Sequence, residues 1–220
     1  MKLRNIFSVF CLLFLVFGSL SIVHGPCFAE SLLPWQPLKE ITIKIDLMNG
    51  NKKAKAKIIK QALEMAGHCV AEHPKEAGCY YYRGQVTGLY YENHLFGYQG
   101  GVRSMIADWQ KALELDPKFD HGGPDRMLGE IYTDLPKYFG TKDVRQDLNK
   151  AIQHLEKSIQ IAPDYPTQRI DLATALLKAN RKDEARIALE SAKTKIPKWP
   201  EDPYFSGWQE DAKELEGELE

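Results

Sequence analysis

The feature that most constrains this chain is a set of residues that recurs after 34 positions. The recurring residues are Ala151, Leu155, Ser158 and Pro163 in one copy and Ala185, Leu189, Ala192 and Pro197 in the next. A small, a large apolar and a second small residue at i, i+4 and i+7 share one helix face, and the small ones let a neighbouring helix approach. Proline then ends the unit, because it has no backbone N–H and clashes with a continuing helix. The pattern predicts stacked helical units.

Each of these helices is preceded by a second repeated pattern, in which a small residue separates large ones. It is found at Leu128–Tyr132 and again at Leu172–Leu176. With the first pattern it resembles the tetratricopeptide-repeat (TPR) family, whose unit is a helical hairpin. The resemblance implies an all-α, TPR-like helical-hairpin solenoid that binds a protein or peptide partner. We expect no enzymatic activity and no cofactor, since the chain has no P-loop, GxSxG or GxGxxG motif.

Prolines at positions 74, 117, 163 and 197 mark the ends of four units. We therefore expect a solenoid over residues 51–220, with repeats at about 77–121, 122–165 and 166–199. Residues 51–73 are expected to form the second helix of a divergent half repeat, and residues 204–219 a C-terminal capping helix. Residues 30–50 are expected to form an extended N-terminal arm, because Ile41–Asp46 alternates like a strand and no partner strand is visible.

The first 29 residues have the pattern of a secretory signal peptide. Lys2 and Arg4 precede an almost unbroken apolar run, and small residues lie before a cleavage point after about Ala29. The alternatives are an uncleaved membrane anchor and a lipid on Cys27, whose preceding residues do not match a lipobox. We expect a periplasmic or secreted protein that meets a membrane only through such an anchor.

Both middle units carry about nine or ten extra residues at the turn between their helices. The first insert is Leu89–Gly101 and the second is Asp134–Thr141; both are rich in aromatic residues and glycine. Equivalent turns of stacked repeats lie along one edge, so we expect the inserts to be neighbours. Their aromatic residues could bind a partner or could cover the helix ends. They are Tyr91, Phe96, Tyr98, Tyr138 and Phe139.

The first helix of each hairpin should line the concave surface of the array, where a partner would bind. The repeat register predicts a set of residues on this surface, with the insert aromatics above one edge. The set is Tyr81, Gln85, Leu89, Arg126, Glu130, Ile170, Thr174 and Lys178. Arg126 is the strongest candidate, because a guanidinium can hold a carboxylate through two hydrogen bonds. The alternative for Arg126 is an internal ion pair with Glu130, four residues on.

Cys69 and Cys79 are the two cysteines beyond the signal segment. In an exported chain they could form a disulfide across the turn between two helices, or remain two buried thiols. Cys69, His73 and Cys79 lack a visible fourth ligand, so we expect no metal site. The 29 basic and 30 acidic residues give no support for nucleic-acid binding. Residues 39–60 are rich in lysine and residues 200–220 in acidic residues, as expected of solvated helix faces.

Two further motifs make the chain similar to one particular group of TPR-like proteins. Gly122–Gly129 has the form Gly-Gly-Pro-x-Arg-x-Leu-Gly, and Pro136–Gly140 has the form Pro-x-x-Phe-Gly. Together with the aromatic inserts, they are similar to the TatT-like periplasmic group associated with TRAP-type transporters. That resemblance implies a cavity for a small apolar solute and assembly into oligomers. A solute-binding accessory of a TRAP-type transporter is therefore the alternative to a protein-binding scaffold.

Overall fold

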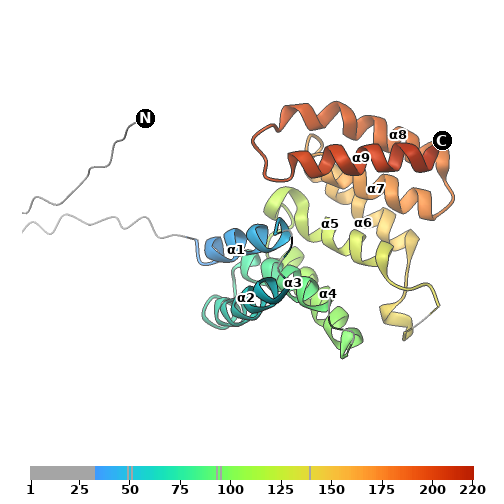
Figure 1. Cartoon of the computed structure of the whole chain (residues 1–220). Coiled ribbons are helices and arrows are strands. Elements are labelled where there is room, and N and C mark those ends of the chain that lie inside the picture. The colour runs from blue at the N-terminus through green and yellow to red at the C-terminus, as the bar shows by residue number, and fades with distance from the viewer. Residues whose placement is uncertain (1–32, 49, 51, 93, 95, 139) are drawn as a thin grey trace, which may run out of the picture. The chain divides into compact units, whose positions relative to one another are not determined.

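The computed structural model describes residues 33–220 except positions 49, 51, 93, 95 and 139, so the expected signal peptide lies outside the described residues. Helices that follow one another in this part of the chain pack together in order (Figure 1). This arrangement confirms the all-α, TPR-like solenoid. The helices are α1 (Gln36–Asp46), α2 (Lys52–Glu72), α3 (Ala77–Tyr91), α4 (Tyr98–Leu115), α5 (Phe119–Asp134), α6 (Leu148–Ile161), α7 (Thr167–Lys178), α8 (Lys182–Lys195) and α9 (Phe205–Leu219), with short 3-10 turns η1 (Lys142–Val144) and η2 (Ile196–Lys198).

The extended arm expected over residues 30–50 is wrong in its described part, because residues 36–46 form α1. Leu38, Thr42 and Ile45, at i, i+4 and i+7, are all buried. Because the middle residue of this buried face, Thr42, is polar, the sequence does not show an apolar helical stripe here. Helix α1 packs against α2 and α3, and so provides the first helix of the leading half repeat.

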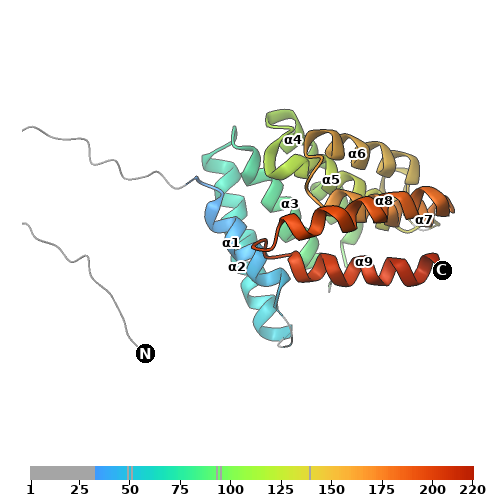
Figure 2. The same ribbon diagram turned by 90° about the horizontal axis from the view of Figure 1, so that it is seen from above.

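Three further hairpins follow: α3 with α4, α5 with α6, and α7 with α8. The hairpins cover residues 77–115, 119–161 and 167–195, whereas the expected repeats were about 77–121, 122–165 and 166–199, so α5 begins three residues before the expected second repeat. Helix α9 then packs against α7 and α8 at the end of the array, in the place of the expected capping helix (Figure 2).

Glycines at equivalent positions of α3 and α5 allow the two helices of a hairpin to touch. A Cβ added to Gly84 would lie 2.4 Å from Nε1 of Trp109, and one added to Gly129 would lie 2.5 Å from Cγ of Leu155. The third repeat has the small residue Ala173 at this position, and it is fully buried. The small-residue positions of the repeat are therefore set by helix–helix packing.

A disulfide joins Cys69 of α2 to Cys79 of α3, with the two Cα atoms 5.4 Å apart. The structure thus contains the bridge that the sequence left open against two buried thiols. It ties the leading helix pair to the first full repeat.

The two inserts are neighbours, as expected. Arg103, just after the first insert, donates from Nε to Oδ2 of Asp143 at 2.6 Å and from Nη2 to Oγ1 of Thr141, also at 2.6 Å. These bonds join the start of α4 to η1 along one edge of the array.

No helix in the described part of the chain is both long enough and apolar enough to cross a bilayer.

Candidate functional site

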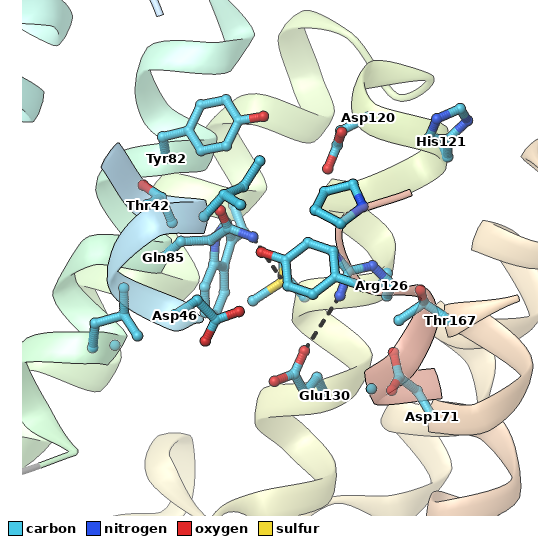
Figure 3. A pocket seen from close by; sticks show the side chains of 18 of the residues that line it. Thr42, Asp46, Tyr82, Gln85, Asp120, His121, Arg126, Glu130, Thr167 and Asp171 are labelled. Carbon is cyan, nitrogen blue, oxygen red and sulfur yellow. Dashed lines mark hydrogen bonds and ion pairs between the residues drawn. The ribbon is translucent and has the colours of Figure 1, made fainter. Parts of the chain in front are cut away.

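A hollow of about 440 Å³ lies on the face formed by the first helices of the hairpins. Its lining comes from α1, α3, α5, α7 and α9, together with Met105 and Trp109 of α4 and residues 202–204 from the segment before α9. Figure 3 shows side chains from these separate helices pointing toward one another around Arg126. Helices α1 and α9 therefore complete a site that the repeats alone would leave open.

Arg126 lies at the centre of this hollow, and only 13% of its side chain is exposed. Its Nη2 donates to the Tyr81 hydroxyl at 2.9 Å, and its Nη1 lies 3.5 Å from Oε2 of Glu130. Burial opposes the charge of Arg126. The Tyr81 hydroxyl and the carboxyl groups of Asp171, Glu130 and Asp120 outweigh burial and keep the pKa of the guanidinium above its ordinary value. Arg126 is thus a permanent cation that the protein itself surrounds.

Two carboxyl groups beside Arg126 lie in surroundings that disfavour their ionised form. Burial and the nearby charge of Glu130 raise the pKa of Asp171 well above its ordinary value, although Arg126 acts in the opposite direction. Burial also raises the pKa of Glu130, against the effect of Arg126 and with that of Asp134. In addition, Oδ2 of Asp171 is shielded from solvent and has no hydrogen-bond partner among the described residues. The protein therefore leaves negative charge in the hollow incompletely balanced.

The start of α5 forms another wall, and its backbone is unusual. Asp120 and His121 have φ values of 46° and 61°, in the left-handed region that non-glycine residues rarely adopt. The Tyr81 hydroxyl donates to Oδ2 of Asp120 at 2.8 Å, and Nε2 of Gln168 donates to the carbonyl of His121 at 2.7 Å. The His121 ring stacks on Tyr165 with centroids 4.4 Å apart. Such strain persists only where neighbours fix it, and it is common at binding sites.

A second hollow of about 380 Å³ continues between α5, α7 and α9. The two hollows share four acidic residues: Glu130, Asp134, Asp171 and Asp211. Lys178 lines the second hollow, but its Nζ is 2.6 Å from Oδ1 of Asp134 and is thus already paired. The shared residues make the hollows parts of one groove.

Most of the predicted concave residues lie in this groove. Gln85, Leu89 and Arg126 line the first hollow. Ile170, Thr174 and Lys178 line the second, and Glu130 lines both. Tyr81 is different: it is fully buried behind Arg126 and Asp120, so it supports the hollow and is not part of its surface.

The aromatic residues of the inserts do not roof the groove, and that expectation is wrong for those the structure describes. Phe96 is 99% exposed and Tyr138 is 75% exposed. Tyr91 packs over Gly101 and against Tyr98. None of these four residues lines either hollow; Phe139 lies outside the described residues. The inserts run along the edge between α4 and η1, whereas α1 and α9 take the place beside the groove.

Sequence reasoning missed the residues that α1 and α9 contribute. They are Lys39, Thr42, Ile43 and Asp46 from α1 and Gly207, Trp208 and Asp211 from α9. It also missed Asp120 and Asp171. One signal was available: Asp171 follows Ile170 on the face that carries Thr174 and Lys178, so a wider stripe would have included it. The acidic bias of residues 200–220 is visible in the sequence, but it fits a solvated helix face equally well.

Within the described residues, no group of three or more His, Cys, Asp or Glu side chains is arranged to hold a metal ion.

Comparison with known proteins agrees with this architecture. Residues 145–202 match a family model described as tetratricopeptide repeat. A thermophilic TPR protein of Thermus thermophilus has a similar structure, with a TM-score of 0.55 over 84% of this chain and 89% of that chain at 14% identity. At that identity the likeness shows the fold alone. No curated protein matches the sequence.

Proposed function

We propose, from the tetratricopeptide-repeat fold of this chain, that it is an exported, non-catalytic scaffold that binds an extended segment of a partner protein in the cell envelope. TPR arrays present long concave surfaces, and such surfaces suit extended segments. One observation carries the proposal: two hollows joined by shared residues run along the first helices of the hairpins.

Two features support export. Lys2 and Arg4 ahead of the apolar run, and the small residues before Glu30, fit a signal peptide. The disulfide between Cys69 and Cys79 fits an oxidising compartment, where such bonds persist. N-terminal sequencing of the mature protein should begin at about Glu30. A mature chain that still begins at Met1 in the cytosol would contradict export.

The binding surface can be tested by site-specific photo-crosslinking. A p-benzoylphenylalanine residue is placed at Gln85 in the first hollow or at Lys178 in the second, and a displayed random-peptide library is screened for crosslinks. Glu156 is the control position, because it is exposed on α6, which contributes no residue to either hollow. Peptides should crosslink at positions 85 and 178 but not at 156. Crosslinks only at 156, or none at all, would overturn the proposed function.

A second candidate is a solute-binding accessory of a TRAP-type transporter. It is favoured by the first hollow, which α1 and α9 help to bound and whose 440 Å³ suits a small molecule. Native mass spectrometry of protein purified from the periplasm should then show bound small-molecule mass that denaturation removes. A bare polypeptide mass would argue against this candidate.

A further inference from the structure

Acidic residues far outnumber basic residues in the lining of the first hollow. Eight of its described lining residues are acidic: Asp46, Glu92, Asp120, Glu130, Asp134, Asp171, Asp202 and Asp211. Lys39 and Arg126 are its lysine and arginine, and Arg126 is surrounded by its own acidic neighbours. The second hollow adds Glu214 and Glu218, and it also contains Lys178, which is paired with Asp134. A carboxylate ligand for Arg126, the chemistry that the sequence suggested, would thus enter a site that already repels anions.

Buried polar atoms in the hollow are left without partners. Thr42 is only 4% exposed, and its Oγ1 has no hydrogen-bond partner among the described residues. Oδ2 of Asp171 is likewise shielded from solvent and has no hydrogen-bond partner among the described residues. Both residues line the cavity (Figure 3). Nε of Arg126, a donor in the same hollow, also has no partner among the described residues. Burying unpaired polar atoms costs free energy, so the oxygens of Thr42 and Asp171 favour a ligand group that donates hydrogen bonds, while Nε of Arg126 favours an acceptor such as a backbone carbonyl of the ligand.

Aromatic rings share the walls with these acceptors. Tyr82, Trp109, Tyr165, Tyr204 and Trp208 all line the first hollow. Ring faces attract organic cations and also cover the apolar stem that carries the charge. The combination of carboxylates, acceptors and rings suits an ammonium or guanidinium group on an alkyl chain.

We propose that the first hollow binds a lysine or arginine side chain of the partner segment, and that the acidic second hollow binds a further basic side chain of the same segment. This inference rests on the proposed function and specifies the chemistry of the partner. A partner cation would supply the donors that Thr42 and Asp171 lack, and would balance the charge that Arg126 leaves uncompensated.

The test uses the full mature protein and a fluorescein-labelled peptide of Lys-Gly-Ser repeats, with binding measured by fluorescence anisotropy. The matched peptide has Glu in place of every Lys. The Lys peptide should bind and weaken as salt is raised, and the Glu peptide should not bind. Equal binding of the two peptides, or no binding of the Lys peptide, would overturn the proposal.

Variants then locate the site. Asp171→Asn and Asp211→Asn should each weaken binding of the Lys peptide about tenfold, which corresponds to about 1.4 kcal/mol. Glu156→Gln removes the same charge from α6 and should leave binding unchanged. Asp211 is exposed, so its variant stays informative if Asp171→Asn alters folding. Equal losses of peptide binding in all three variants would mean that the peptide is attracted non-specifically, and would overturn the assignment of the site to the first hollow.

Two outcomes distinguish this proposal from binding of a free polyamine and from the scaffold function as a whole. Displacement of the Lys peptide by spermine at equal charge concentration would assign the site to a free polyamine, and would overturn the assignment to a partner segment. If random peptides crosslink at Gln85 and Lys178 but the Lys peptide does not bind, the cation proposal fails while the scaffold function stands. If nothing crosslinks there, the scaffold function itself fails.

Discussion

At the scale of single residues, the groove is built around charges that the protein balances only in part. Arg126 has hydrogen-bonded and charged neighbours on its own α5 and on α3, so the ion pair with Glu130 that the sequence allowed is present. Asp171, one helix further on, has one oxygen without a hydrogen-bond partner among the described residues. The two residues therefore lead to opposite expectations for stability.

Replacing Arg126 by alanine should destabilise the fold by about 1–3 kcal/mol, because it removes the hydrogen bond to the buried Tyr81 hydroxyl and the counter-charge of the partly buried Glu130 and Asp171. Urea unfolding followed by circular dichroism measures the loss. Arg103→Ala is the control, since the Arg103 ion pair with Asp143 is exposed and its loss should cost much less. Equal losses for the two variants would contradict the central role of Arg126.

Asp171→Asn should instead stabilise the protein at pH 7, by about 1 kcal/mol. The pKa of Asp171 is raised in the folded state, so the folded protein binds the proton more tightly and loses stability as pH rises above the unfolded value of about 3.9. Asparagine removes this loss. Arg126, Glu130, Asp134 and Asp211 face the same carboxyl group.

The gain from Asp171→Asn should shrink as pH falls toward about 4, where the wild-type carboxyl is protonated too. Urea titrations at both pH values measure it. A gain that is independent of pH would show that ionisation of Asp171 is not the cause. More stable protein with weaker peptide binding would mark Asp171 as a residue kept for function.

At the scale of helices, the contact between α5 and α6 depends on one glycine and one leucine. A Cβ at Gly129 would lie 2.5 Å from Cγ of Leu155 and 3.1 Å from the carbonyl oxygen of Ala151. Leu155 is fully buried. The same small-against-large contact recurs between Gly84 and Trp109 in the preceding hairpin.

Leu155→Ala should cost about 2–5 kcal/mol through the cavity it leaves, and Gly129→Ala about 1–3 kcal/mol through overpacking. The double variant should cost less than the sum, because the smaller side chain at 155 makes room for the new methyl group. Urea unfolding of all three variants measures the coupling. Gly67→Ala is the control: nothing lies within 4 Å of its Cβ, and it should stabilise α2 by about 0.5–1 kcal/mol. Strictly additive losses at 129 and 155 would contradict this packing.

The link between α2 and α3 gives a separate prediction. With the proposed export, protein isolated from the periplasm without reductant and then unfolded should show no free thiol at Cys69 or Cys79. Replacing both by serine should cost about 2–3 kcal/mol in the chain-entropy model, because the disulfide closes a short loop. Thiol titration and urea unfolding are the measurements. Two reactive thiols in the mature chain would exclude the bridge.

At the scale of the whole described molecule, the groove joins helices from both ends of the array. Asp46 of α1 and Tyr204, just before α9, line the same hollow as Arg126 of α5. A ligand seated there should therefore connect the leading helix pair to the capping helix. It should stabilise the folded array as a unit.

A Lys-Gly-Ser peptide at about one hundred times its Kd should add about 2.7 kcal/mol to the free energy of unfolding. For a chain of this size that corresponds to a rise in Tm of roughly 5–11 °C. Differential scanning fluorimetry measures the shift. The Glu peptide should give none, and Asp211→Asn should reduce the shift at equal peptide concentration. Equal shifts for both peptides would contradict selective binding.

The sequence by itself determined the class of fold. Ala151 and Ala185, the prolines at 163 and 197, and the small residues at 129 and 173 report contacts within a helix or between adjacent helices. Those contacts recur at fixed spacing, since each repeat packs on the next in the same way. The same register placed Gln85, Arg126 and Thr174 on the groove.

Only the tertiary structure decided what else lines the groove and what its charge is. Thr42, Asp171 and Asp211 lie on three different helices far apart in the chain, and no local spacing connects them. The sequence predicts an extended arm where α1 forms, because alternation over six residues fits both a strand and a broad helix face. The inserts had the composition of a binding edge, but α1 and α9 occupy the place beside the groove. Which residues meet there depends on how the two ends of the array pack, and a periodic pattern does not record that.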